Sequence, residues 1–157
     1  MDFLIKNVNI ENINKFTIFF QNIIDSKYIK DLLGSILYLG NIVNKGTSYG
    51  NAEGFNLLEI SNMEVNKIKL IDYIKSKCNK VDININIVDL SYDTVCYDVN
   101  EVINIKNNLN IKHNKFDEIN IIYKKMIKKS QEICNKFGIA KINDDIINQF
   151  IDLCNTN

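Results

Sequence analysis

The stretch KFDEINIIYKKMIKKSQEICNKFG, residues 115–138, carries the clearest helical pattern in the chain. Its apolar residues recur at steps of three and four, which places them along one side of a long amphipathic helix. The pair Phe137-Gly138 ends the pattern in the manner of a glycine C-terminal cap. The sequence therefore predicts a helix from about residue 115 that stops at Gly138. Its expected buried side consists of Phe116, Ile119, Ile122, Tyr123, Met126, Ile127 and Ile133.

Other segments repeat this helical period, and Ser26 is suited to cap the second of them. The sequence contains no proline, so nothing fixes φ or removes an N–H inside a long helix. The expected fold class is all-α, an elongated helical bundle. The remaining helices are predicted over residues 10–24, 29–39, 63–77, 93–109 and 144–153.

Residues 81–90, VDININIVDL, are ambiguous, because apolar residues at every second position from Val81 to Ile87 are typical of a strand. No second run of this kind is present to pair with it. We interpret the segment as a loop or as the entry to a helix. The length of 157 residues and a hydrophobic content of 46% fit one domain or a sizeable piece of one.

Charge balance and cysteine spacing bear on which partners, metal sites and disulfides the protein is expected to have. Nineteen basic and nineteen acidic residues cancel, so no global charge favours nucleic acid or an anionic membrane as a partner. Cys78, Cys96, Cys134 and Cys154 form no C-x-x-C pair, and His113 is the sole histidine, so free reduced thiols are expected rather than a metal site or disulfides. No apolar run is long enough to span a membrane, and no signal-peptide layout opens the chain. These features predict an intracellular, cytoplasmic protein.

Catalytic motifs are not found in the sequence. The segment GTSYGNAEG lacks the Gly-Lys-Ser/Thr end of a phosphate loop, and His113 has no Ser or Cys partner at motif spacing. We interpret His113 as a solvated surface residue. Asp144 and Asp145 lie at an expected helix start, where carboxylates stabilise exposed N–H groups. We therefore expect a protein that is not an enzyme, with no catalytic residue, metal or cofactor.

The predicted helix over residues 115–138 also carries a lysine face, formed by Lys124, Lys125, Lys128 and Lys129. The ordinary interpretation is a solvated helix face. The functional alternative is contact with an acidic protein or with a phosphate backbone. Nucleic acid is the weaker form of that alternative, because no aromatic residues are interleaved for base stacking.

The stretch GNIVNKGTSYGNAEGF, residues 40–55, holds four of the six glycines and is expected to form an irregular loop. The wider segment LLGSILYLGNIVNKGTSYGNAEGFNL, residues 32–57, resembles the formin homology 2 domain, the actin-assembling module of formins. In that family a helix ends in Gly-Asn-x-Met-Asn and a glycine-containing loop leads to Gly-Phe. Val43 replaces the usual Met, a tolerable apolar exchange. The matching positions are Gly40, Asn41 and Asn44 in the first motif, and Gly54, Phe55 and Leu57 in the second.

Two further segments are similar to the same family with lower specificity, namely residues 70–74 and 132–154. The resemblance implies a mostly helical domain that joins a second copy head to tail, when the lasso of one subunit encircles the post of the other. In the family this ring nucleates actin and tracks the barbed end of the filament. The motif region belongs to the post, which implies a docking surface for the lasso. Its residues here are Gly40, Asn41, Asn44, Gly46, Gly54 and Phe55.

Glycines let a foreign backbone approach closely, and asparagines offer it both donors and acceptors. Phe55 is expected to return the chain to its own core. The chain is expected to correspond to the C-terminal half of the domain, the post with the adjoining coiled coil, without lasso, linker and knob. We therefore do not expect it to nucleate actin by itself.

Residues 56–69 are shorter than in the family, which has a lysine implicated in actin contact there; either Lys67 or Lys69 takes its place or the contact is missing. The candidate actin contacts are Lys67, Lys69, Lys124, Lys125, Lys128 and Lys129. The implied partners are actin and a second formin subunit, at the cytoskeleton, without nucleic acid or membrane. Two alternatives stay open: a helical interaction scaffold without actin activity, and a small enzyme that uses the glycine loop as a phosphate cradle.

Overall fold

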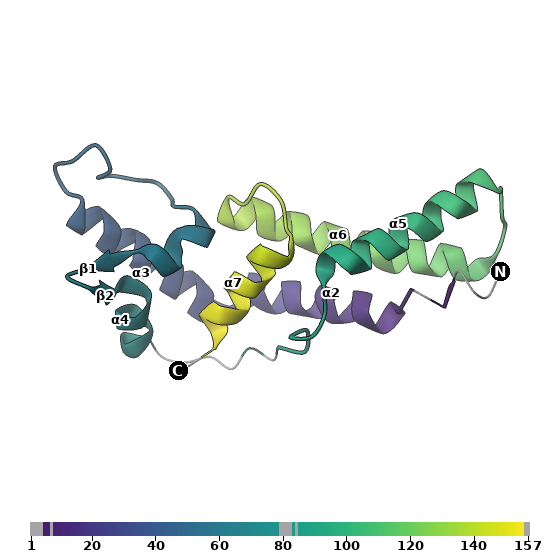
Figure 1. Ribbon diagram of the computed structural model, residues 1–157, viewed down its shortest axis with the longest axis horizontal. Helices are drawn as coiled ribbons and strands as arrows, with labels where there is room; N and C mark the ends of the chain where they lie inside the picture. Colours follow the sequence, from purple (N-terminus) through teal and green to yellow (C-terminus); the bar gives the residue numbers. More distant parts are fainter. Residues whose placement is uncertain (1–4, 7, 79–82, 84, 156–157) are drawn as a thin grey trace. The chain divides into compact units, whose positions relative to one another are not determined.

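Helices dominate the computed structural model, which describes residues 5–6, 8–78, 83 and 85–155 (Figure 1). The all-α fold class is confirmed. Five of the helices match expected segments within a few residues. The elements are α2 (Ile10–Asp25), α3 (Lys27–Val43), η1 (Leu57–Asn62), β1 (Glu64–Val65), β2 (Ile68–Lys69), α4 (Leu70–Lys77), α5 (Tyr92–Asn108), α6 (Asn114–Phe137) and α7 (Asp144–Cys154).

The chain divides into two compact units. Unit 1 comprises the described residues of 1–24 and 84–147, and unit 2 those of 25–83 and 148–157. Helix α7 begins in unit 1 and ends in unit 2. The two units are described separately below.

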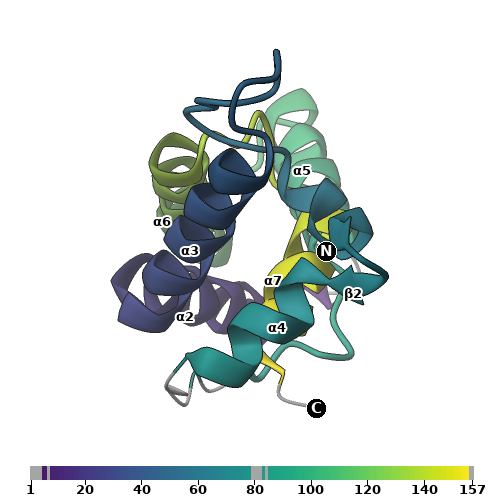
Figure 2. The same cartoon turned by 90° about the vertical axis from the view of Figure 1, so that its left-hand side faces the viewer.

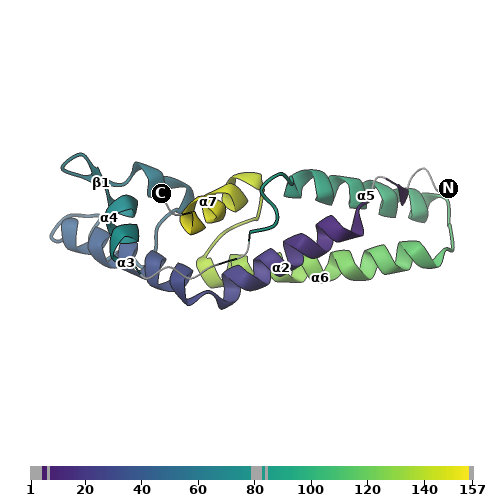
Figure 3. The same ribbon diagram turned by 90° about the horizontal axis from the view of Figure 1, so that it is seen from below.

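Unit 1 is built on the pair α5 and α6, which run side by side and are joined by the short turn at residues 109–113 (Figure 3). Helix α2 adds a fully buried aromatic residue, Phe16, whose ring lies 5.4 Å from the ring of Tyr92 at an interplanar angle of 76°. Phe20 contacts the same tyrosine in the same edge-to-face manner at 5.6 Å. This geometry is a favourable one for aromatic pairs, so the cluster fixes α2 against the start of α5.

The first turns of α5 and α7 cap each other. Asp144 Oδ1 accepts a hydrogen bond from the Tyr92 backbone N–H at 2.6 Å, and its Oδ2 accepts one from Ser91 Oγ at 2.7 Å. In return, Asp93 Oδ2 accepts a hydrogen bond from the Asp144 N–H at 3.2 Å. Each carboxylate therefore satisfies N–H groups at the positive end of the other helix. Asp144 lies in the first turn of α7, as predicted, but the hydrogen bonds of its carboxylate are made with the start of α5.

Three other expected details are also found. Ser26 Oγ accepts a hydrogen bond from the Ile29 N–H at 3.0 Å, so it is the N-cap of α3. Gly138 ends α6 in the left-handed conformation, with a φ of +66°. His113 is exposed, as predicted, and its Nδ1 accepts a hydrogen bond from the Lys115 N–H at 3.2 Å. That N-cap role of His113 was not expected from the sequence.

The helix predicted over residues 63–77 is wrong in its first half. Residues Glu64–Val65 and Ile68–Lys69 pair as an antiparallel hairpin, and the helix α4 begins only at Leu70. The two tip residues, Asn66 and Lys67, have φ values of +52° and +66°, as a two-residue type I′ turn requires. Part of the ambiguous stretch 81–90, at positions 81, 82 and 84, lies outside the described residues, and residues 83 and 85–90 form no strand.

All four cysteines are free and partly buried. Burial raises the pKa of the Cys96 and Cys134 thiols, and raises the pKa of Cys154 to about 11. These three groups are therefore neutral thiols at neutral pH, which makes them poor nucleophiles. Within the described part of the chain, none of the helices has the length and apolar content that crossing a bilayer requires.

Unit 2 contains α3, the loop of residues 44–56, η1, the hairpin, α4 and the second part of α7 (Figure 2). Its core is formed by the apolar sides of these helices, with Ile29, Leu32 and Ile36 of α3 fully buried. The end of α7 is held by Lys75, whose Nζ donates to the backbone carbonyl oxygens of Asp152 and Asn155. A cation at the last carbonyls of a helix is favourable because the helix dipole is negative there.

Candidate protein-docking site

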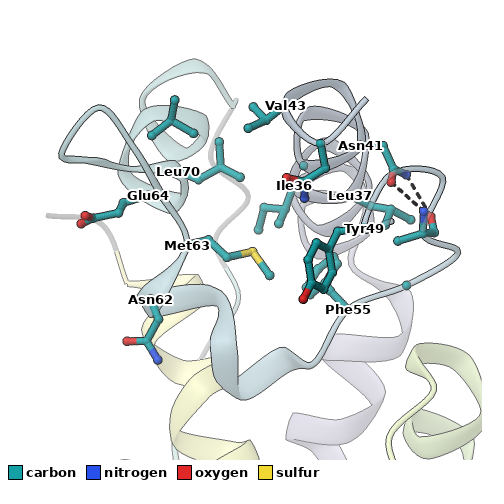
Figure 4. Close-up of a pocket in the computed structure, with 15 residues that line it drawn as sticks. Ile36, Leu37, Asn41, Val43, Tyr49, Phe55, Asn62, Met63, Glu64 and Leu70 are labelled. Carbon is teal, nitrogen blue, oxygen red and sulfur yellow. Dashed lines mark hydrogen bonds between the residues drawn. The ribbon is translucent and has the colours of Figure 1, made fainter. Parts of the chain in front are cut away.

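A pocket of about 340 Å³ lies in unit 2 between the second half of α3, the loop of residues 44–56 and the start of the hairpin (Figure 4). The motif positions singled out in the sequence meet at this place. Gly46 is not among the residues that line the pocket. The other five predicted docking residues, Gly40, Asn41, Asn44, Gly54 and Phe55, do line it.

The wall of the pocket is mostly apolar. Met63 follows the end of η1 and points toward Tyr49 and Phe55 (Figure 4). Its neighbours Asn62 and Glu64 point away from the pocket. Phe55 is half-buried in this wall, so the expectation that it returns the chain to the core is wrong. The buried residue that follows it, Leu57, makes that return. A pocket with this lining suits an apolar group of a partner.

The rim of the pocket leaves apolar side chains in water. Tyr49 is 76% exposed and Val43 is 54% exposed, and both line the pocket. Exposed apolar side chains at the rim of a pocket mark a candidate protein-interaction site. Tyr38 and Ile42 of α3 are also exposed, but they do not line the pocket.

The side-chain amide of Asn41 forms hydrogen bonds with the loop that follows α3. Its Nδ2 donates to the Ala52 carbonyl oxygen at 2.9 Å, and its Oδ1 accepts from the Ala52 N–H at 2.7 Å. Asn44 contributes through its backbone, because its carbonyl oxygen accepts from the Thr47 N–H at 3.0 Å and from Thr47 Oγ1 at 2.8 Å. Contact of Asn41 and Asn44 with a partner stays a prediction.

The four glycines of the stretch divide into two pairs. Gly46 has a φ of +84°, and a Cβ at Gly50 would lie 2.5 Å from the Asn44 carbonyl oxygen, so the loop itself requires these two. A Cβ at Gly40 or Gly54 would meet no atom within 4 Å. The fold does not require glycine at these two positions, and both border the pocket.

Replacing Gly50 with alanine is expected to lower the free energy of unfolding by about 1–3 kcal/mol, because the added methyl group clashes with a backbone oxygen that cannot rotate away. The Gly54→Ala variant is the matched control in the same loop, and no loss of stability is expected there. Urea titration followed by circular dichroism measures both changes. Equal stability of the two variants would contradict this assignment of Gly50.

The predicted lysine contacts fall into both units. In unit 2, Lys67 lies at the tip of the hairpin, and Lys69 is directly opposite Glu64 across the two strands. The lysines of α6 belong to unit 1. Lys124, Lys125 and Lys128 are exposed, whereas Lys129 Nζ lies 2.7 Å from the carboxylate of Glu132.

Comparison with known proteins adds one finding. No protein-family model matches the chain. Over 72 aligned residues the chain is 40% identical to Formin-A of Dictyostelium discoideum. Part of the chain is therefore formin-related in sequence. The alignment covers 43% of this chain and 6% of Formin-A, so the chain spans a small part of that formin's length.

Sequence reasoning did not identify every residue of the pocket. Tyr49, Met63 and Leu70 line it, although nothing in their local pattern marks them as part of a site. The hairpin was also missed, because its turn residues Asn66 and Lys67 contain no glycine and are not a typical two-residue hairpin turn. The apolar residues beside them also fit a helical period.

Proposed function

We propose that this chain is a binding module of the formin type, which docks a segment of a second formin subunit in the pocket beside the glycine loop and associates with actin. The observation that carries the proposal is the convergence of Gly40, Asn41, Asn44, Gly54 and Phe55 on one pocket. The partial identity with Formin-A supports the choice of family. The work proposed for the chain is binding rather than catalysis, in a cytoskeletal setting.

Gly40 and Gly54, which the fold does not require, support the proposed docking site. Gly40 lies inside helix α3, where glycine is less favourable than alanine by about 0.5–1 kcal/mol. Since no atom of the chain occupies the place of its missing Cβ, packing does not explain the glycine. Space for a partner's backbone at the pocket explains it.

Replacing Gly40 with alanine is expected to stabilise the protein by about 0.5–1 kcal/mol while weakening capture of a formin lasso segment about fivefold or more. Gly34→Ala is the matched control, because Gly34 lies in the same helix, has open space around it and does not line the pocket. It should stabilise equally and leave capture unchanged. Fluorescence anisotropy with a labelled lasso peptide measures capture, and equal affinity of both variants would overturn the proposed docking site.

We assign the proposed actin contact in unit 2 to Lys67 rather than Lys69. Lys67 holds a left-handed conformation that is costly for a residue with a side chain, and such backbone strain tends to persist at functional positions. The register places the carboxylate-bearing Glu64 opposite Lys69, which reduces the positive charge that Lys69 presents. The exposed lysines of α6 offer a second basic surface in unit 1.

Lys67→Gly is expected to weaken co-sedimentation with actin filaments about three- to tenfold, because it removes one charged contact. Glycine favours the left-handed turn, so the hairpin should be retained and slightly stabilised. Lys69→Gln is the matched control, with a smaller expected effect. If the unmodified chain does not sediment with actin at all, the interaction scaffold without actin activity becomes the better function.

A further inference from the structure

The second half of the pocket loop is tied to helix α3 at one place. Residues 44–56 contain no helix or strand, and the turn bonds from Thr47 to Asn44 and from Gly50 to Thr47 lie within the first half of the loop. Among the described residues, the hydrogen bonds from residues 51–55 to α3 are those between Ala52 and Asn41. Asn41 therefore supplies the hydrogen bonds that join this part of the pocket wall to α3.

The Asn41–Ala52 pair has the form of a short stretch of sheet (Figure 4). The side-chain amide of Asn41 donates to and accepts from the same residue, as two backbone peptide groups do across an antiparallel pair. The N–H and carbonyl groups of Ala52 are thereby both satisfied. Gly54 and Phe55 follow within three residues, and both line the pocket. Loss of the pair would release this stretch of the wall to solvent.

We propose that Asn41 is a positioning residue, which clasps the loop to α3 and holds the pocket in its docking-competent form, rather than a residue that contacts the partner. The part of this inference that concerns partner binding rests on the proposed function. The clasp itself does not. A pocket that is formed only part of the time binds with an affinity reduced by its populated fraction, chiefly through slower association.

The first experiment tests the clasp without a partner. Asn41→Ala should accelerate hydrogen exchange of the Ala52 amide about tenfold, since two exposed hydrogen bonds are lost. Alanine is a good helix former, so the last turn of α3 is retained. Glu53→Gln is the control in the same loop, with unchanged exchange expected. Exchange of Ala52 that is the same in Asn41→Ala and in the unmodified chain would overturn the clasp.

The second experiment separates positioning from contact, with the kinetics of lasso-peptide binding to the full chain. A positioning role predicts that Asn41→Ala lowers the association rate constant about fivefold or more and leaves the dissociation rate constant nearly unchanged. An increase confined to the dissociation rate constant would overturn the positioning role in favour of direct contact. No binding by the unmodified chain, together with faster exchange in the variant, would reject the proposed function and leave the clasp established.

Discussion

Replacing Phe16 with alanine is expected to lower the free energy of unfolding by about 3–5 kcal/mol, the range for a fully buried phenylalanine in a packed core. The ring lies edge-to-face against Tyr92 and also contacts Phe20, so its removal leaves a cavity and disrupts two aromatic pairs. Helix α2 would lose a principal contact with the start of α5. Chemical denaturation monitored by circular dichroism measures the change.

The matched control is Ile18→Ala in the same helix. Ile18 is 59% exposed, so its truncation should change the free energy of unfolding by less than about 0.5 kcal/mol. The two substitutions alter the same helix but different sides of it. If both substitutions lower the free energy of unfolding equally, α2 does not bury the side that contains Phe16.

Replacing Asp144 with alanine is expected to lower the free energy of unfolding by about 2–3 kcal/mol. This is the second largest loss of stability that we predict. The substitution removes the acceptor of the Tyr92 N–H and of the Ser91 hydroxyl, both at the start of α5. It also removes one of the two carboxylates at the start of α5, since Asp93 of that helix remains. Thermal unfolding in low salt measures the loss.

Asp145→Ala controls for the general effect of a carboxylate in the first turn of α7. Asp145 is exposed and occupies the same turn, yet the bonds to α5 belong to Asp144. We expect the Asp145 variant to lose at most about 0.5–1 kcal/mol through the dipole alone. A loss equal to that of Asp144→Ala would show that capping of α5 contributes little.

Most helices were predictable because burial on one side of a helix imposes its own period on the sequence. The α6 pattern, which ends at Gly138, illustrates the point: the apolar residues predicted for its buried side, from Phe116 to Ile133, are all buried or half-buried. The hairpin was not predictable in the same way. Val65, Ile68 and Ile71 satisfy a helical spacing, and only the backbone conformation of Asn66 and Lys67 separates the two outcomes.

The candidate site was predictable in part, for a different reason. The motif positions are close in sequence, so the loop that follows α3 brings Gly40 and Gly54 to one pocket. The opposite wall comes from Met63 and Leu70, whose arrival depends on how η1 and the hairpin fold back. The bonds of Asn41 could not be assigned either, because an asparagine side chain is equally able to bind a partner or its own loop.

The mutual caps of α5 and α7 have a kinetic consequence. The residues that they join are 51 to 53 positions apart in the chain, so forming these bonds requires closing a long loop that contains α6. Interactions of such long range tend to be absent from the folding transition state. We therefore expect loss of Asp144 to speed unfolding much more than it slows folding, so that these carboxylates prolong the lifetime of the folded unit rather than guide its formation.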